Sequence, residues 1–361
     1  MVNFYFLLGI LLIILVKSKK NELLLLISFS IIFGFILFPY QWDTIGEQYY
    51  DYARFLDSDN VFSAAKARAY TIQPLFYEFA EKFRNLFETN SIQSINLIRY
   101  FIFFFSLLAM YYFSYHLRKD LSLNNIFINN RFPSLVVFLF CIQWSFSYLI
   151  VANQFRQFFA FPFIFFGIAS VMKRNYVSAI LFFLVAYLSH GSSLLIIILF
   201  ISVFFIRKFQ NPLFIGLILF LITPIAFVLI KETILTLSPY YGGRLEYSKH
   251  NILLTGVSSG FYLLTLHYLF MVMSFIIFAG KTLKSQFVKV TFLIWCIVFS
   301  FFLFPLFGIP FAEPARAASI LAPFSSILIS IAIVKAKLFF RFFILLEVIA
   351  AYYFLTDYAG L

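Results

Sequence analysis

An arginine with amide side chains on both sides lies between two apolar runs of the chain, in the segment VANQFRQFFAFPF. Asn153, Arg156 and Gln157 follow i, i+3, i+4 spacing, so they share one face if the segment is helical. A guanidinium in such a setting can bind phosphate through parallel N–H donors. If the flanking runs cross a membrane, burying these groups is costly, so we expect them to bind an anionic ligand. The alternative is an arginine that extends to the outer headgroups.

A lone histidine interrupts the apolar stretch 176–206, where His190 is followed by Gly191-Ser192-Ser193. Each limb is about 23 Å long as a helix, which is short for a hydrocarbon core of roughly 30 Å. The stretch therefore predicts a helical hairpin whose tip is recessed from the outer surface, in a protein-lined cavity. There His190 would be a catalytic or ligand-binding residue. The alternative is a packed polar residue.

A long segment that is predicted to be external, 41–92, supplies Asp43, with Glu47 on the same face if the segment is helical. Further along, apolar residues recur at helical spacing between Leu75 and Phe87, with charged residues between them. This pattern predicts an amphipathic helix on the outer membrane interface. The alternative is a loop that only caps the helical bundle.

Two further segments carry groups that suit a sugar or an anion. Within 232–256, Tyr241 and Arg244 can stack and hydrogen-bond, although an aromatic belt at the membrane interface would look the same. In GIPFAEPARAAS, Pro314 suits the first position of a helix, Glu313 precedes it, and Arg316 follows in the first turn. A helix N-terminus and a guanidinium together favour phosphate. The alternative is a Glu313–Arg316 pair that closes the turn.

The elements that must position these residues are membrane helices. The chain is 63% hydrophobic and only 12% charged, and its apolar runs are continuous, which predicts an all-α integral membrane protein. We expect a polytopic bundle of about 11 to 12 transmembrane helices in a single domain, 1–361, with external loops at 41–92 and 232–256. The predicted spans are 2–16, 23–40, 93–115, 133–152, 157–172, 176–189, 191–206, 212–231, 258–280, 290–307, 317–334 and 342–356.

The net charge of +12 is explained by topology. Basic residues gather on alternate connections, where Glu22 and Asp120 are the acidic residues, so these connections are predicted to be cytoplasmic and both termini external. Nucleic-acid binding is therefore not supported. The basic residues of these connections are Lys17, Lys19, Lys20, Arg118, Lys119, Arg131, Lys173, Arg174, Arg207, Lys208, Lys281, Lys284, Lys289, Lys335, Lys337 and Arg341.

Neither the cysteines nor the remaining histidines form a pattern typical of a metal site. Cys141 and Cys296 lie in apolar runs without metal-ligand spacing, and His116, His250 and His267 have no ligand-spaced neighbour. We therefore expect no metal and no other cofactor.

Several of these motifs together resemble the EpsG-like family of polysaccharide polymerases and glycosyltransferases, broadly the Wzy type of O-antigen, capsule and exopolysaccharide assembly. The family's N-x-x-R-Q-x-x-A element and its histidine beside small hydroxyl residues are matched by Asn153, Arg156, Gln157, Ala160, His190, Ser192 and Ser193. Its external Asp-Thr…Tyr element, the Pro-aromatic segment that follows and its late arginine are matched by Asp43, Thr44, Tyr50, Pro74, Phe76, Tyr77 and Arg316.

The resemblance implies a GT-C-like fold and a multi-pass enzyme of the bacterial cytoplasmic membrane that extends a glycan carried on undecaprenyl pyrophosphate. Arg156 and Arg316 would stabilise the leaving pyrophosphate, and His190 or Asp43 would be the base. The implied partners are the lipid-linked glycan, the bilayer and, as a candidate, a chain-length regulator protein. The residues implied to bind substrate are Asn153, Gln157, Glu47, Tyr50, Tyr241, Arg244 and Glu313.

Three other functions fit the same composition. A flippase for lipid-linked sugars would also use cations in a cavity, but it should show internal repeats and deeper basic residues, and no convincing repeat is present. A glycosyltransferase that adds one sugar from a polyprenyl phosphate would need the same groups. A membrane O-acyltransferase would use its histidine with a thioester.

Overall fold

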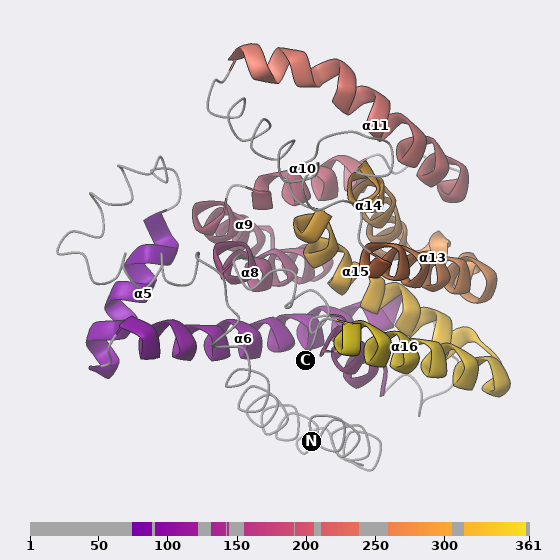
Figure 1. Cartoon of the computed structure of the whole chain (residues 1–361), viewed down its shortest axis with the longest axis horizontal. Coiled ribbons are helices and arrows are strands. Elements are labelled where there is room, and N and C mark those ends of the chain that lie inside the picture. The colour runs from indigo at the N-terminus through magenta and orange to yellow at the C-terminus, as the bar shows by residue number, and fades with distance from the viewer. Residues whose placement is uncertain are drawn as a thin grey trace. The chain divides into compact units, whose positions relative to one another are not determined.

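A computed structural model describes residues 74–88, 91–121, 131–141, 143, 155–190, 192–205, 211–237, 259–304 and 314–358. These residues form helices joined by short turns, and no strand occurs among them (Figure 1). The all-α prediction is thus confirmed for the described residues, while the GT-C-like fold and the number of spans stay predictions. By contacts between Cα atoms the chain divides into two compact units, and each is described separately.

Unit 1 comprises residues 1–138 and 152–198. Its helices include α5 (Pro74–Phe87), α6 (Ser91–Asp120), α8 (Phe155–Met172) and α9 (Tyr176–Ser189). The helix Arg131–Cys141 and α10 (Ser192–Phe205) each extend across the boundary between the residue ranges of the two units. α5 is the amphipathic helix that the spacing from Leu75 to Phe87 predicts.

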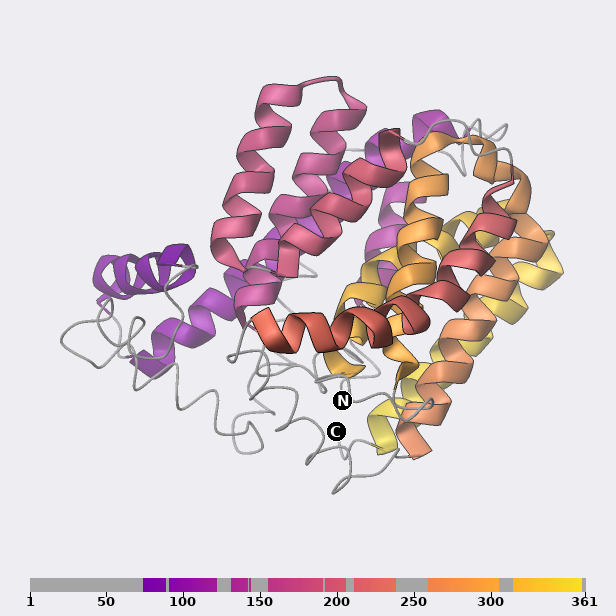
Figure 2. The same cartoon turned by 90° about the horizontal axis from the view of Figure 1, so that it is seen from above.

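The antiparallel pair α8–α9 is the centre of unit 1. A turn at Lys173–Asn175 joins the two helices, with Arg174 in the left-handed region (φ 60°). Asn175 caps α9, because its side chain accepts a hydrogen bond from the backbone N–H of Ser178. The helices approach closely at Gly167, where an added Cβ would collide with the Phe183 ring. Figure 2 shows the pair with its short turn at the upper end of the view.

Unit 2 comprises residues 139–151 and 199–361. Its helices include α11 (Pro212–Leu237), α13 (Ser259–Ala279), the 3-10 helix η2 (Gly280–Lys284), α14 (Gln286–Phe302), α15 (Pro314–Lys335) and α16 (Leu338–Tyr358). α11 continues to Leu237, so the predicted loop 232–256 begins with helical residues. α15 begins at Pro314, as predicted.

α14 forms the core of unit 2 and is buried along almost all of its length. It packs against α11 on one side, where an added Cβ at Gly216 would lie 2.7 Å from the Phe292 ring. It packs against α15 on the other, where the Trp295 indole Nε1 donates a hydrogen bond to Ser325 Oγ at 2.8 Å. α13 packs against both α15 and α16.

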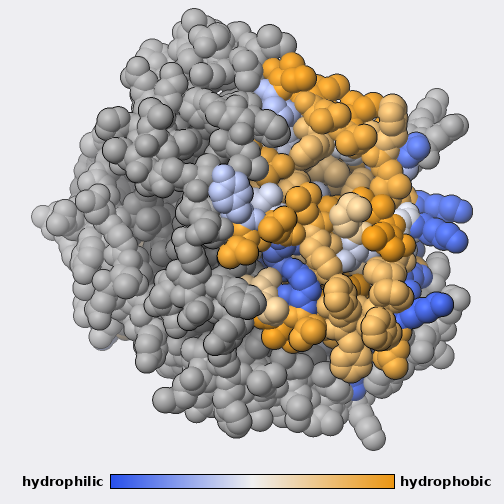
Figure 3. Space-filling model, turned by 45° about the vertical axis from the view of Figure 1, so that its right-hand side comes forward, coloured by the Kyte–Doolittle hydropathy of each residue, from blue (hydrophilic) through white to orange (hydrophobic). Residues whose placement is uncertain are grey.

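Much of the outer surface of the described helices is apolar. Leu and Phe side chains are exposed along α16, and Ile, Leu and Met side chains along α13. Figure 3 shows this apolar surface on one face, with hydrophilic groups along its right-hand edge. Within the described residues, Tyr262–Lys284 is the helix that is long and apolar enough to cross a membrane. Apolar side chains facing outward are typical of helices surrounded by lipid.

Candidate functional site

The α8–α9 pair brings two predicted site residues to the same end of unit 1. Arg156 is the second residue of α8, about 24 Å along the helix from Met172, and His190 lies about 21 Å along the chain axis from Tyr176. Because the two helices are neighbours joined by a short turn, the start of α8 and the end of α9 lie at the same end of the pair. Helices in contact have axes about 8–10 Å apart. The pair therefore brings the backbones of Arg156 and His190 to one end of unit 1.

The predicted interruption of the helix at His190 is confirmed. His190 ends α9 with an extended backbone (φ −159°, ψ 125°), and α10 begins at Ser192. The His190 N–H donates to the carbonyl of Ala186 at 3.0 Å, and the His190 carbonyl accepts from the N–H of Ser193 at 3.0 Å. Both backbone groups of His190 are thus hydrogen-bonded, which fixes the half-buried residue between two helices. Its depth in a membrane stays a prediction.

α5 lies at the same end of unit 1. The ring centroids of Phe76 and Phe79 are 5.6 Å and 4.9 Å from that of Phe159, one turn beyond Arg156. Phe79 also contacts Phe101 in the first half of α6, with ring centroids 5.4 Å apart. The aromatic cluster attaches the helix of the 41–92 segment to the start of α8. That this segment and Arg156 lie on one side of the membrane stays a prediction.

The other predicted site residues are not placed with respect to this pair. Gln157 and Arg316 belong to the first turns of α8 and α15. The structure describes the backbones of Arg156, Gln157 and Arg316 but not their side chains. Their approach to His190 stays a prediction. The residues that lie wholly outside the described ranges are Asp43, Glu47, Tyr50, Asn153, Tyr241, Arg244 and Glu313.

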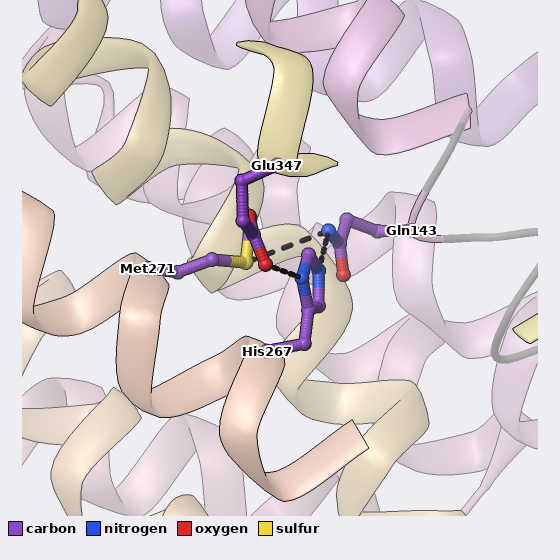
Figure 4. A network of polar contacts seen from close by, with 4 residues as sticks. All are labelled: Gln143, His267, Met271 and Glu347. Atoms are coloured by element: carbon purple, nitrogen blue, oxygen red, sulfur yellow. Dashed lines mark hydrogen bonds and ion pairs between the residues drawn. The ribbon is translucent and has the colours of Figure 1, made fainter. Parts of the chain in front are cut away.

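Unit 2 contains a buried polar network that the sequence did not predict (Figure 4). The Gln143 amide nitrogen Nε2 lies 2.8 Å from His267 Nε2, and His267 Nδ1 lies 2.9 Å from Glu347 Oε1. An amide nitrogen can only donate, so His267 Nε2 accepts and Nδ1–H donates to the carboxylate. The His267 side chain is 1% exposed and the Glu347 side chain 23%. The second N–H of Gln143 contacts Met271 Sδ at 3.5 Å.

The network leaves two acceptors without a hydrogen-bond partner among the described residues, Gln143 Oε1 and Glu347 Oε2. Both ring nitrogens of His267 are hydrogen-bonded in this arrangement, Nε2 as acceptor from Gln143 and Nδ1–H as donor to Glu347. The network thus joins α13, α16 and the segment that contains Gln143. No group of three or more His, Cys, Asp or Glu side chains suited to a metal ion occurs in the described ranges.

The model of one protein family, the EpsG family, matches residues 100–360. This range contains Arg156, His190 and Arg316, as well as the Gln143–His267–Glu347 network, and it excludes the segment around Asp43. No curated protein and no solved structure matches the chain.

Proposed function

The chain belongs to the EpsG family, which is associated with polysaccharide polymerases, and on this premise we propose that it is a glycosyltransferase that polymerises undecaprenyl-pyrophosphate-linked oligosaccharides. The reaction would take place on the outer face of the bacterial cytoplasmic membrane. The family match supports a polysaccharide biosynthesis role and membrane association. The observation that favours this chemistry most is the α8–α9 pair, because the backbones of Arg156 and His190 lie at the same end of it.

In the proposed reaction, an acceptor hydroxyl oxygen forms a bond to the anomeric carbon of the growing glycan. The bond between that carbon and the pyrophosphate oxygen breaks, and the lipid pyrophosphate leaves with the electron pair. Guanidinium groups can stabilise the developing negative charge, the role that we assign to Arg156 and Arg316. The proton of the hydroxyl passes to a general base, for which His190 and Asp43 are the candidates.

The remaining polar residues would bind the sugars. Amides at Asn153 and Gln157 can donate to and accept from sugar hydroxyls, and carboxylates at Glu47 and Glu313 can accept from them. Tyr50 and Tyr241 offer rings on which a pyranose can stack, and Arg244 a further anion contact. The apolar outer surface of the helices suits a polyprenyl chain that arrives laterally from the bilayer.

Replacement of Arg156 tests this proposal. In cells that make the polymer through this chain, Arg156→Ala should reduce polymer roughly 100- to 1,000-fold, because a fixed donor to the leaving group is lost. Single repeat units should accumulate on the lipid carrier. The measurement is the ladder of glycan lengths on a gel, together with the amount of protein in the membrane.

Arg174→Ala is the matched control, because it removes an arginine from the other end of the same helix pair. It should leave the ladder intact. A normal ladder with Arg156→Ala would overturn the assignment of Arg156. Purified protein that moves lipid-linked repeat units across vesicles without lengthening them would instead identify a flippase, and addition of one sugar from a polyprenyl phosphate would identify a single-sugar transferase.

A further inference from the structure

Unit 1 has a second polar cluster, at the end opposite to Arg156. Lys173, in the α8–α9 turn, donates from Nζ to Tyr112 Oη on α6 at 3.1 Å. Arg118, in the last turn of α6, places its guanidinium carbon 4.0 Å from the centroid of the Tyr115 ring. The His116 ring contacts both tyrosines, with ring centroids 4.7 Å from Tyr112 and 5.4 Å from Tyr115. The two cations are thus held by aromatic side chains.

This cluster has hydrogen-bond donors and positive charge that no ion pair with a described residue neutralises. Neither Lys173 nor Arg118 forms an ion pair with a carboxylate of the described residues. The Lys173 ammonium uses one N–H for Tyr112 and keeps two. Since Tyr112 Oη accepts from Lys173, its own O–H can donate elsewhere. The cluster therefore offers several donors and excess positive charge, which suits a phosphate group.

An exposed apolar face begins directly after the cluster. On α9, Val177, Ile180, Leu181 and Leu184 are exposed by 72%, 66%, 58% and 50%, and their spacing places them on one side of the helix. From Val177 to Leu184 this face is about 10 Å long. This face belongs to the helix that begins three residues after Lys173, so a molecule with a phosphate at Lys173 would have an apolar surface of this length within reach.

We propose that this cluster binds an anionic phospholipid of the cytoplasmic leaflet, with its phosphate between Lys173, Tyr112 and Arg118 and an acyl chain along the exposed face of α9. Anionic headgroups attract basic residues next to a span, and apolar side chains replace the contacts that the acyl chain makes in the bilayer. The proposal uses the predicted orientation of the chain and is independent of the chemistry at Arg156.

The general preference of cytoplasmic loops for basic residues does not account for this arrangement. Lys281 and Lys284 lie on a predicted cytoplasmic turn too, but there they make no contact with an aromatic ring or a hydroxyl of the described residues. Lys173 and Arg118 are held in place by Tyr112 and Tyr115. Binding of a headgroup therefore costs less side-chain conformational entropy at Lys173 than at a lysine that makes no such contact.

The test compares two pairs of substitutions in the full chain, purified in mild detergent. Native mass spectrometry counts bound phosphatidylglycerol, with phosphatidylcholine as the uncharged comparison. The wild type and the control Lys281→Gln/Lys284→Gln should each retain one phosphatidylglycerol with the same affinity. In Lys173→Gln/Arg118→Gln the affinity should fall roughly 25-fold, or about fivefold for each cation lost. Lys173→Gln alone gives the fivefold change if the double variant unfolds.

Equal weakening by both pairs would show that the lipids are held only by general charge and would overturn the proposal. So would unchanged binding in Lys173→Gln, or preferential capture of an acidic peptide by the cluster.

The His116 ring provides a readout inside the cluster. Burial lowers the pKa of His116, and the charges of Lys173, Lys119 and Arg118 lower it further. A phosphate bound among these cations offsets their charge, so addition of phosphatidylglycerol should raise the pKa of His116 in a proton NMR titration. Phosphatidylcholine should leave it unchanged. The same shift with both lipids would contradict binding through the anionic headgroup.

Discussion

At the scale of single residues, the network of Gln143, His267 and Glu347 is the feature that could not be predicted from the sequence. The contacts join residues 124 and 80 positions apart, so neither spacing nor periodicity brings them together. From the sequence, His267 had no ligand-spaced neighbour and Glu347 was a charge inside the last apolar run. The available signal was that each lies near the middle of a predicted span, where a polar group requires a partner.

Removal of one member should destabilise unit 2. Glu347→Ala leaves the buried Nδ1–H of His267 without its acceptor, at a cost of about 1–3 kcal/mol in the free energy of unfolding. Thermal melting in detergent should show the loss. Glu347→Gln, which keeps an acceptor oxygen, should lose less.

A triple replacement is the control for this network. With Gln143→Leu, His267→Leu and Glu347→Leu no polar member of this network remains, so much of the stability should return. A Glu347→Ala protein that melts with the wild type would show that the contact contributes nothing to stability.

Stability should also depend on pH through His116. Because its pKa is lowered in the folded state from 6.5, the unfolded chain binds a proton more readily near that pH. The contribution of neutral His116 to the free energy of unfolding is therefore present above pH 6.5 and is lost as the pH falls below it. Melting temperatures from about pH 8 to about pH 5.5 should decline less in His116→Gln than in the wild type. Identical slopes would exclude His116 as the source.

At the scale of helices, much of the fold follows from the sequence. The predicted spans 176–189 and 191–206 correspond to α9 and α10, because His190-Gly191 interrupts an otherwise apolar run. Pro314 begins α15, since proline suits the first helical position. The limit of α11 at Leu237 was not predicted, because polar residues such as Lys231 and Glu232 ended the apolar run although the helix continues. Which helices pack together also escaped prediction, because this depends on the shapes of their surfaces.

Close packing of α8 and α9 should depend on Gly167. Gly167→Ala places a methyl group against the Phe183 ring and should destabilise the protein by about 1–3 kcal/mol. Since the pair places Arg156 and His190 at one end, polymer yield should fall as well. Melting temperature and ladder intensity are the two measurements.

Gly280→Ala is the matched control, because an added Cβ there has no neighbour within 4 Å. It should change neither measurement. If both variants behave like the wild type, the α8–α9 contact is loose enough to accept a methyl group.

At the scale of the whole molecule, the charge distribution predicts an orientation. In unit 1, one end carries α5 and the positions of Arg156 and His190, and the opposite end carries Lys173, Arg174 and the basic last turn of α6. The family match adds that a chain of this kind belongs to a membrane-associated biosynthetic system. The candidate chemistry is thus separated from the basic surface by the length of the helices.

Reporter fusions should reveal this orientation. An enzyme that is active only outside the cytoplasm should be active when fused after Leu361 and inactive when fused after Arg174, since basic turns stay cytoplasmic. A fluorescent protein that matures only inside should give the opposite pattern. Activity of the external reporter after Arg174 would reverse the topology and move the proposed site to the inner face.

The hydrogen bond between Gln143 and His267 has a consequence for how the chain is made. The ribosome adds His267 124 residues after Gln143, which at about 5–20 residues per second takes roughly 6 to 25 s. During this interval the amide of Gln143 is already present and the imidazole of His267 does not yet exist. The hydrogen bond between Gln143 and His267 can therefore form only late in synthesis. Until then the Gln143 amide needs other hydrogen-bond partners, such as water, lipid headgroups or an insertion factor.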